Sequence, residues 1–130
     1  MRFLPTKVHG LLDYVVGIAL IAAPNIFQFA EVGGAAVIVP RVLGVGLIVY
    51  SFFTDYEWGV IRKLPMSYHL LVDYIAAGTL VLSPFTFGFA EQGLNVWLPH
   101  VAVGLTVVAV VAVSKPGVAV PGVTKYELAS

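Results

Sequence analysis

Two ionisable pairs lie in otherwise apolar stretches of the chain, and their residue types could do chemistry. His9 and Asp13 are four residues apart, and His69 and Asp73 have the same spacing. Residues four apart share one face of a helix, so each imidazole can reach the carboxylate of its own pair. A histidine titrates near neutral pH, and a carboxylate in hydrocarbon must be paired, neutral or hydrated. The four side chains therefore form a candidate polar cluster.

Three hypotheses account for these pairs. In the structural one, each histidine hydrogen-bonds the aspartate of its own helix and so satisfies a polar group inside an apolar bundle. In the second, the four groups line a polar site that relays protons or conducts a cation. In the third, His9 and His69 ligate haem or a metal, and the two aspartates orient them. The spacing alone does not decide between them.

The chain carries no pattern that names a reaction. It contains no Ser/His/Asp triad, no phosphate-binding loop and no zinc signature, so we expect a non-enzymatic protein without catalytic residues. We expect no cofactor, and the sequence leaves open whether any metal is bound. The favoured role is that of a small structural or stress-related membrane component.

The two pairs belong to an internal repeat with a period of sixty residues. Residues 4–33 return as residues 64–93, and thirteen of these thirty positions are identical. A fixed period of this kind defines an architecture. We therefore expect one domain over residues 1–115, with repeat 1 at about 4–55 and repeat 2 at about 64–114. Residues 116–130 should form an extended tail.

Composition indicates that the solvent of this chain is lipid. Of its 130 residues 59% are hydrophobic and 11% are charged, against roughly 25% charged in soluble domains. The net charge is zero, so no basic patch indicates nucleic acid as a partner. The absence of cysteine excludes disulfides and thiolate metal sites. The expected partner is the lipid bilayer, with a homo-oligomer as a further option.

Four apolar stretches are long enough to cross a membrane, at about residues 8–29, 35–53, 68–89 and 96–113. They should be helices, because each span must satisfy its own backbone in lipid. The fold class expected is an all-α membrane protein of four transmembrane helices. Two spans per repeat make two parallel helix hairpins, which a pseudo-twofold axis along the membrane normal should relate.

Basic residues predict the orientation of these spans. Lysine and arginine gather near the two chain ends and in the central loop, and such residues favour the cytoplasmic side. Both termini should therefore be cytoplasmic, and the short turn within each repeat should face outward. The residues concerned are Arg2, Lys7, Arg62, Lys63, Lys115 and Lys125.

Other residues predict where the spans end and how they pack. Pro24 and Pro84 should kink or end the first and third helices, and the aromatic stretches after them should lie in the membrane interface. A small residue, Gly17 or Ala77, follows each aspartate by one turn and should let another helix approach closely. His100 reads as a residue of the membrane interface. The segment 50–58 reads as an aromatic belt and loop.

The stretch after each of these prolines resembles the SPW-repeat family of small bacterial membrane proteins, whose repeat is a helical pair bearing Ser-Pro-Trp followed by Gly-Phe. The second copy keeps Ser-Pro and the glycine, whereas Asn25 and Phe85 replace the tryptophan and Gln28 replaces the first glycine. The resemblance covers about residues 4–114 and implies an integral protein of the bacterial inner membrane with two copies of the repeat. The residues that carry it are Pro24, Phe27 and Phe29 in the first copy and Ser83, Pro84, Phe87, Gly88 and Phe89 in the second.

Overall fold

The protein is a bundle of four long helices, as a computed structural model describes it for residues 2–116. Their bounds are Thr6–Ile26 for α1, Gly34–Phe52 for α2, Met66–Thr86 for α3 and Leu94–Val113 for α4. Short 3-10 turns, η1 (Ala30–Val32) and η2 (Ala90–Gln92), join the helices within each repeat. All four helices are long and apolar enough to cross a membrane. The predicted all-α membrane fold is thus confirmed; the tail expected beyond residue 116 lies outside the described residues.

Prolines set the ends of α1 and α3. Pro5 and Pro65 stand directly before the two helices, where a missing N–H costs little. Pro24 and Pro84 each lie two residues before the end of their helix, as expected of a residue that cannot donate to the preceding turn. The β-branched run 106–113, typical of strands in water, is helical in α4.

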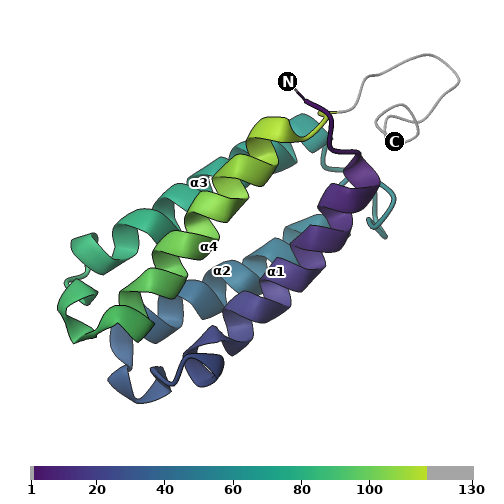
Figure 1. Ribbon diagram of the computed structural model, residues 1–130. Coiled ribbons are helices and arrows are strands. Elements are labelled where there is room, and N and C mark those ends of the chain that lie inside the picture. Colours follow the sequence, from purple (N-terminus) through teal and green to yellow (C-terminus); the bar gives the residue numbers. More distant parts are fainter. Residues whose placement is uncertain (1, 117–130) are drawn as a thin grey trace, which may run out of the picture.

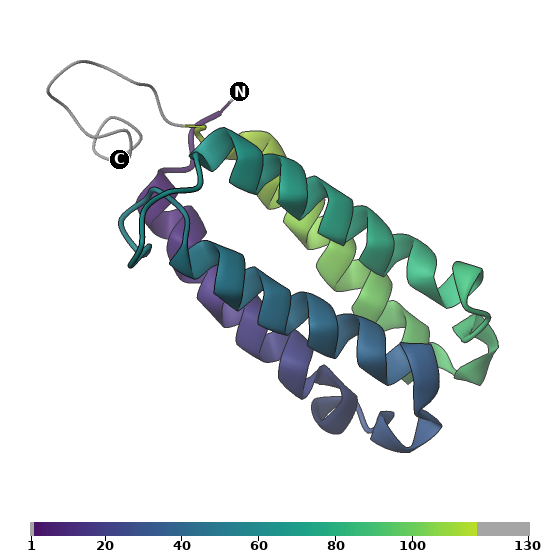
Figure 2. The same ribbon diagram turned by 180° about the vertical axis from the view of Figure 1, so that it is seen from behind.

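The four helices form two hairpins that lie side by side (Figures 1 and 2). α1 packs mainly against α2, and α3 packs mainly against α4. At one end, which we call the turn end, η1 and η2 connect the helices of each hairpin. At the other, which we call the loop end, residues 53–65 connect the hairpins, and the N-terminus lies beside the end of α4.

Small residues allow the two helices of each hairpin to touch. A Cβ atom added at Gly44 would lie 2.6 Å from the carbonyl oxygen of Gly17. In the second hairpin a Cβ atom at Gly104 would lie 2.9 Å from the carbonyl oxygen of Ala77. The close approach predicted at Gly17 and Ala77 is therefore present, and it joins the helices of one hairpin.

Backbone hydrogen bonds at the loop end join the start of each repeat to the end of the other. Leu4 N donates to Val113 O at 2.8 Å, and Leu64 N donates to Phe53 O at the same distance. The donors are sixty residues apart in the sequence, and so are the acceptors. These matching bonds place the first turns of α1 and α3 against the last turns of α4 and α2.

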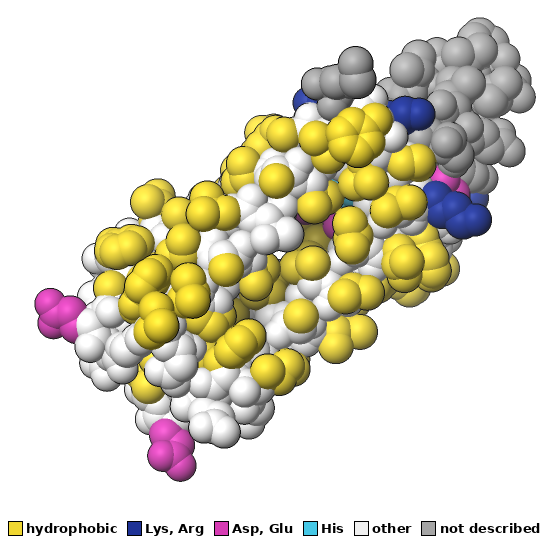
Figure 3. Space-filling model, in the orientation of Figure 1, with side chains coloured by type: hydrophobic (Ala, Val, Ile, Leu, Met, Phe, Trp, Pro, Cys, Tyr) yellow, Lys and Arg dark blue, Asp and Glu magenta, His cyan; other side chains and the backbone are white. Residues whose placement is uncertain are grey.

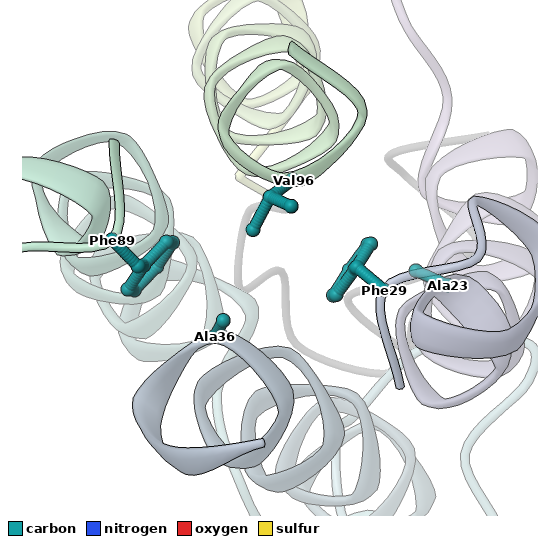
Figure 4. Packing of buried hydrophobic residues seen from close by; sticks show 5 residues of the cluster. All are labelled: Ala23, Phe29, Ala36, Phe89 and Val96. Carbon is teal, nitrogen blue, oxygen red and sulfur yellow. The ribbon is translucent and has the colours of Figure 1, made fainter. Parts of the chain in front are cut away.

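The core at the turn end is apolar and contains one phenylalanine from each aromatic stretch. Phe29 and Phe89 are 1% and 5% exposed, and they pack with alanine and valine side chains between the helices (Figure 4). Phe27 and Phe87 are exposed. The expectation that these stretches lie in the membrane interface therefore fails for Phe29 and Phe89, because their side chains turn inward once α1 and α3 have ended.

The glycine of the family motif occupies a left-handed position that ends a helix. Gly88 has φ +73° directly after the end of α3 and its cap, and Gln28 has φ +59° at the same place after α1. A residue with a Cβ pays roughly 1–2 kcal/mol in this conformation, and glycine does not. The first repeat thus forms the same left-handed turn with Gln28 in place of glycine.

The outer surface is what a lipid-exposed bundle requires. Hydrophobic side chains cover the visible flank of the helices, acidic side chains protrude at the turn end, and basic ones gather at the loop end (Figure 3). Exposed side chains on the four helices include Ile18, Val42, Ile75 and Leu105, each more than half exposed. In water such a surface would favour aggregation, whereas in a bilayer it is matched to its solvent.

Candidate functional site

The structure brings the four candidate residues of the two repeats together inside the bundle. His9 and Asp13 come from the first eight residues of α1, and His69 and Asp73 come from the same positions of α3. One ligand atom from each residue can be chosen so that all four atoms lie within 4.8 Å of one another. The four residues are between 0% and 6% exposed. We call this group the His/Asp cluster.

Each histidine contacts the aspartates of both repeats. His9 Nε2 lies 3.1 Å from Asp13 Oδ1 on its own helix and 3.0 Å from Asp73 Oδ2 on the other hairpin. His69 Nε2 lies 3.0 Å from Asp13 Oδ2 and 3.3 Å from Asp73 Oδ2. The hydrogen bond of His9 Nε2 goes to Asp73. The cluster therefore joins the repeats, whereas the structural hypothesis placed each pair within one helix.

Two hydroxyl groups fix the other nitrogen of each imidazole. Ser114 Oγ donates its proton to Val110 O at 2.6 Å. It therefore accepts a hydrogen bond from Nδ1–H of His9, with 2.6 Å between Nδ1 and Oγ. Thr54 Oγ1 donates in the same way to Tyr50 O near the end of α2, and it lies 2.7 Å from His69 Nδ1. Since a hydroxyl has a single proton to give, both Nδ1 atoms are donors. Both Nε2 atoms are consequently left to face carboxylate oxygens.

Tyrosine hydroxyls complete the two carboxylates. Tyr50, near the end of α2, donates to Asp73 Oδ1, and Tyr56 donates to Asp13 Oδ2 at 2.6 Å. Tyr56 belongs to the loop 53–65 and is fully buried. Its burial, followed by the nearby charge of Asp13, raises the pKa of the Tyr56 phenol above its usual value of 10.0. Tyr56 therefore remains a neutral donor throughout the physiological range.

The loop 53–65 closes the cluster from its end of the bundle. Trp58 Nε1 donates to Lys7 O at 2.7 Å, and Tyr14 donates to Trp58 O at 2.8 Å, so the indole ring is held against α1. A Cβ atom at Gly10 would lie 2.6 Å from this ring. The loop is thus packed onto the first turns of α1, directly above the polar side chains.

A small cavity lies beside the cluster on the side of α1 and α4. Its volume is about 60 Å³, and its walls combine His9, Asp13 and Asp73 with aliphatic side chains of α1, α2 and α4. Figure 3 shows this side of the molecule, where acidic and histidine atoms are visible at the bottom of a hollow between α4 and α1. The space is large enough to admit water beside the polar side chains.

Past the cluster, the bundle interior toward the turn end is mainly apolar. Its buried side chains there include Leu20, Ala77 and Leu80. The third histidine, His100, is buried between Phe29 and Phe89, and its ring nitrogens lie 2.6 Å from Val96 O and 3.0 Å from Ala36 O. His100 is therefore an interior residue that ties α4 to α2, and the expectation of a place in the membrane interface is wrong.

The ring geometry does not fit two axial ligands of a haem. The His9 and His69 rings are 5.3 Å apart between centroids and meet edge to face. A macrocycle ligated on both faces would have to stand between them, in contact with a cavity of only about 60 Å³. The haem form of the third hypothesis is therefore not supported by this arrangement.

Sequence reasoning missed the hydroxyl groups around the cluster. Tyr50, Thr54 and Tyr56 fall in the segment 50–58, which reads as a belt and loop, and Ser114 is not among the predicted site residues. The repeat held a signal for two of them, because Thr54 and Ser114 are sixty residues apart, like the two histidines they contact. The tyrosines have no counterpart at this spacing, so no periodicity could have found them.

Comparison with known proteins gives one family. The family model described as SPW repeat domain matches residues 7–114, which include both hairpins and the whole His/Asp cluster. No curated protein matches the chain. No solved structure matches it either.

Proposed function

The chain belongs to the SPW-repeat family, and from this footing we propose that it is a non-enzymatic structural protein of the membrane. In this role the His/Asp cluster fastens the two helical hairpins to one another within the bilayer. The observation that carries the proposal is the crossed contact, in which His9 reaches Asp73 and His69 reaches Asp13, each at 3.0 Å.

The energetic reason lies in the cost of polar groups in lipid. A charged side chain costs about 2.5–3.5 kcal/mol or more at the centre of a membrane helix. The pairs lie in the first eight residues of α1 and α3, where the cost is smaller, but a hairpin alone would still have to bear it. When the hairpins dock, each carboxylate gains the histidine of the other hairpin, and Asp73 also gains the hydroxyl of Tyr50 from α2. Separation of the hairpins would expose these groups to hydrocarbon, so the cluster favours the docked bundle.

The interior argues against the second hypothesis, a proton or cation pathway. Such a pathway needs polar groups or water along the whole span. In the part of the chain that the structure describes, the buried side chains between the cluster and the turn end are mainly apolar, and both nitrogens of His100 face backbone carbonyls. The cluster is thus closed toward the turn end.

Location and orientation follow from charge and family. We place the protein in the bacterial cytoplasmic membrane with both termini cytoplasmic, because the basic side chains gather at the loop end. The partners that we propose are the lipid bilayer and a second copy of the chain.

The orientation can be tested by cysteine labelling. A cysteine introduced at Glu91, at the turn end, should react with an impermeant maleimide in intact cells, and a cysteine at Lys63, at the loop end, should not.

The test is to remove one charge from the cluster while its shape is kept. Asp13→Asn and Asp73→Asn each leave a buried histidine facing an amide, and each should lower the free energy of unfolding by about 3 kcal/mol. Thr79→Ala, on the exposed side of α3, is the control and should change it by less than about 0.5 kcal/mol. Unfolding is followed by circular dichroism as a denaturing detergent is titrated into the purified protein.

The same variants separate this role from conduction. Wild-type protein in liposomes with a pH gradient should carry no more protons than empty liposomes. Unchanged stability of both Asp→Asn variants would contradict the structural role. A pH-dependent flux that Asp13→Asn abolishes in a folded protein would establish the pathway in its place.

A further inference from the structure

We infer that the His/Asp cluster is a binding site for one divalent transition-metal ion, of which zinc fits best. The inference deepens the proposed function, on which it rests for the docking of the two hairpins. The four ligand atoms would be Nε2 of His9, Nε2 of His69 and one carboxylate oxygen each from Asp13 and Asp73.

The spacing of the ligand atoms is the first argument. Zinc binds imidazole nitrogen and carboxylate oxygen at 2.0–2.2 Å in a tetrahedron, which puts neighbouring ligand atoms roughly 3.3–3.5 Å apart. Asp73 Oδ2 lies 3.0 Å from His9 Nε2 and 3.3 Å from His69 Nε2. Asp13 offers Oδ1 at 3.1 Å from His9 Nε2 and Oδ2 at 3.0 Å from His69 Nε2, and one ligand atom from each residue can be chosen so that all four lie within 4.8 Å of one another. Small adjustments of these side chains would therefore bring one ligand atom of each residue to the spacing of a zinc tetrahedron.

The groups behind the ligands are the second argument. A metal-bound histidine usually donates its other N–H to an acceptor, and ligating carboxylates are themselves hydrogen-bonded. Here both Nδ1 atoms donate to hydroxyls, of Ser114 and Thr54. Both carboxylates accept a tyrosine hydroxyl, from Tyr50 and Tyr56. All four ligands are thus already held with their metal-binding atoms turned toward one another.

The third argument is a buried nitrogen without a hydrogen bond. His69 Nε2 is fully buried and, among the described residues, has no partner at an acceptable angle, although two carboxylate oxygens lie 3.0 and 3.3 Å away. A buried polar atom in this state needs an explanation. Once its proton has left, this nitrogen aims a lone pair between two carboxylate oxygens, which is the arrangement that a metal ion satisfies.

Charge and ligand type select the ion. Two carboxylates and two neutral imidazoles carry a charge of minus two, which a divalent ion cancels inside the low-dielectric bundle. Magnesium and calcium prefer all-oxygen sites with six or more ligands, whereas mixed imidazole and carboxylate sets suit zinc and its first-row neighbours. Four protein ligands in a closed site are typical of a structural zinc rather than a catalytic one.

The test uses full-length, tag-free protein that has been stripped with a chelator in detergent. Zinc alone is titrated by calorimetry, and bound metal is counted by elemental analysis after desalting. We expect one zinc per chain. Cobalt(II), added in place of zinc, should give the intense visible bands of a tetrahedral ion with nitrogen and oxygen ligands. Zinc should also raise the resistance of the bundle to denaturing detergent.

Two variants show whether the ion is at the cluster. Asp73→Asn removes a ligand and should abolish the cobalt bands. Tyr50→Phe removes only the hydroxyl that holds Asp73, and it should weaken zinc binding by roughly 10–100-fold. Tyr74→Phe, next to Asp73 in α3, is the control; Tyr74 is 39% exposed, and the zinc affinity of this variant should equal that of the wild type.

The outcomes separate the two proposals. Folded wild-type protein that takes up no zinc would overturn the metal site, as would zinc binding of equal strength in wild type and in Tyr50→Phe. Loss of stability in the Asp→Asn variants without any metal effect would leave the structural role alone. Zinc bound by a protein whose metal-free Asp→Asn variants are fully stable would leave the metal site alone.

Discussion

At the scale of single residues, the hydroxyls of Thr54 and Ser114 matter as much as the histidines they hold. Each hydroxyl donates its proton to a backbone carbonyl in the last turn of the preceding helix, so it can only accept from the imidazole. This fixes both Nδ1 atoms as donors and leaves both Nε2 atoms for the carboxylates. The histidines and aspartates could be predicted from their repeated spacing, but their crossed pairing required the docked structure.

Tyr56 gives a prediction of pH dependence. Its folded pKa is raised above 10.0 by burial and by the charge of Asp13, so the stability it contributes is present below pH 10 and is lost as pH rises beyond it. The free energy of unfolding should therefore fall between pH 9 and pH 11 by more in the wild type than in Tyr56→Phe. Denaturing-detergent titrations at each pH measure the difference, and parallel curves for the two proteins would refute the assignment.

At the scale of elements, the glycines of α2 and α4 show which contacts set the hairpin geometry. A Cβ atom at Gly44 would meet the carbonyl of Gly17 and side chains of α1, whereas a Cβ atom at Gly46, two residues further along α2, would meet nothing within 4 Å. Hydropathy alone predicted the spans to within a few residues, because membrane helices must be long and apolar. It could not show which glycines face a helix, since both positions are apolar and small.

The pair Gly44 and Gly46 supplies the corresponding prediction. Gly44→Ala should destabilise the bundle by about 1–3 kcal/mol, because the new methyl group meets backbone that cannot yield. Gly46→Ala should be neutral or stabilise by up to about 1 kcal/mol, since alanine is the better helix former. Thermal unfolding in detergent distinguishes them. Equal effects at the two positions would mean that α1 and α2 do not meet at Gly44.

At the scale of the whole molecule, the His/Asp cluster is a consequence of the sequence repeat. Duplication placed a His–Asp pair on each hairpin, and side-by-side docking turned two pairs into four groups within reach of one another. The repeat, the helix count and the family could be predicted from the chain. The inward turn of Phe29 and Phe89 and the interior place of His100 could not, because polar and aromatic residues near a helix end are equally suited to lipid headgroups.

The most direct test of whether the cluster joins the two hairpins is a double-mutant cycle between His9 and Asp73, measured on metal-free protein. His9→Asn retains an amide where Nδ1 stood and removes Nε2, and Asp73→Asn removes the charge that Nε2 faces. The two changes should be strongly coupled, by at least 1 kcal/mol, because the single variants break the same 3.0 Å contact. The cycle of His9→Asn with Thr79→Ala serves as the control and should be additive. Additivity of His9→Asn and Asp73→Asn within about 0.5 kcal/mol would contradict the claim that the cluster joins the two repeats.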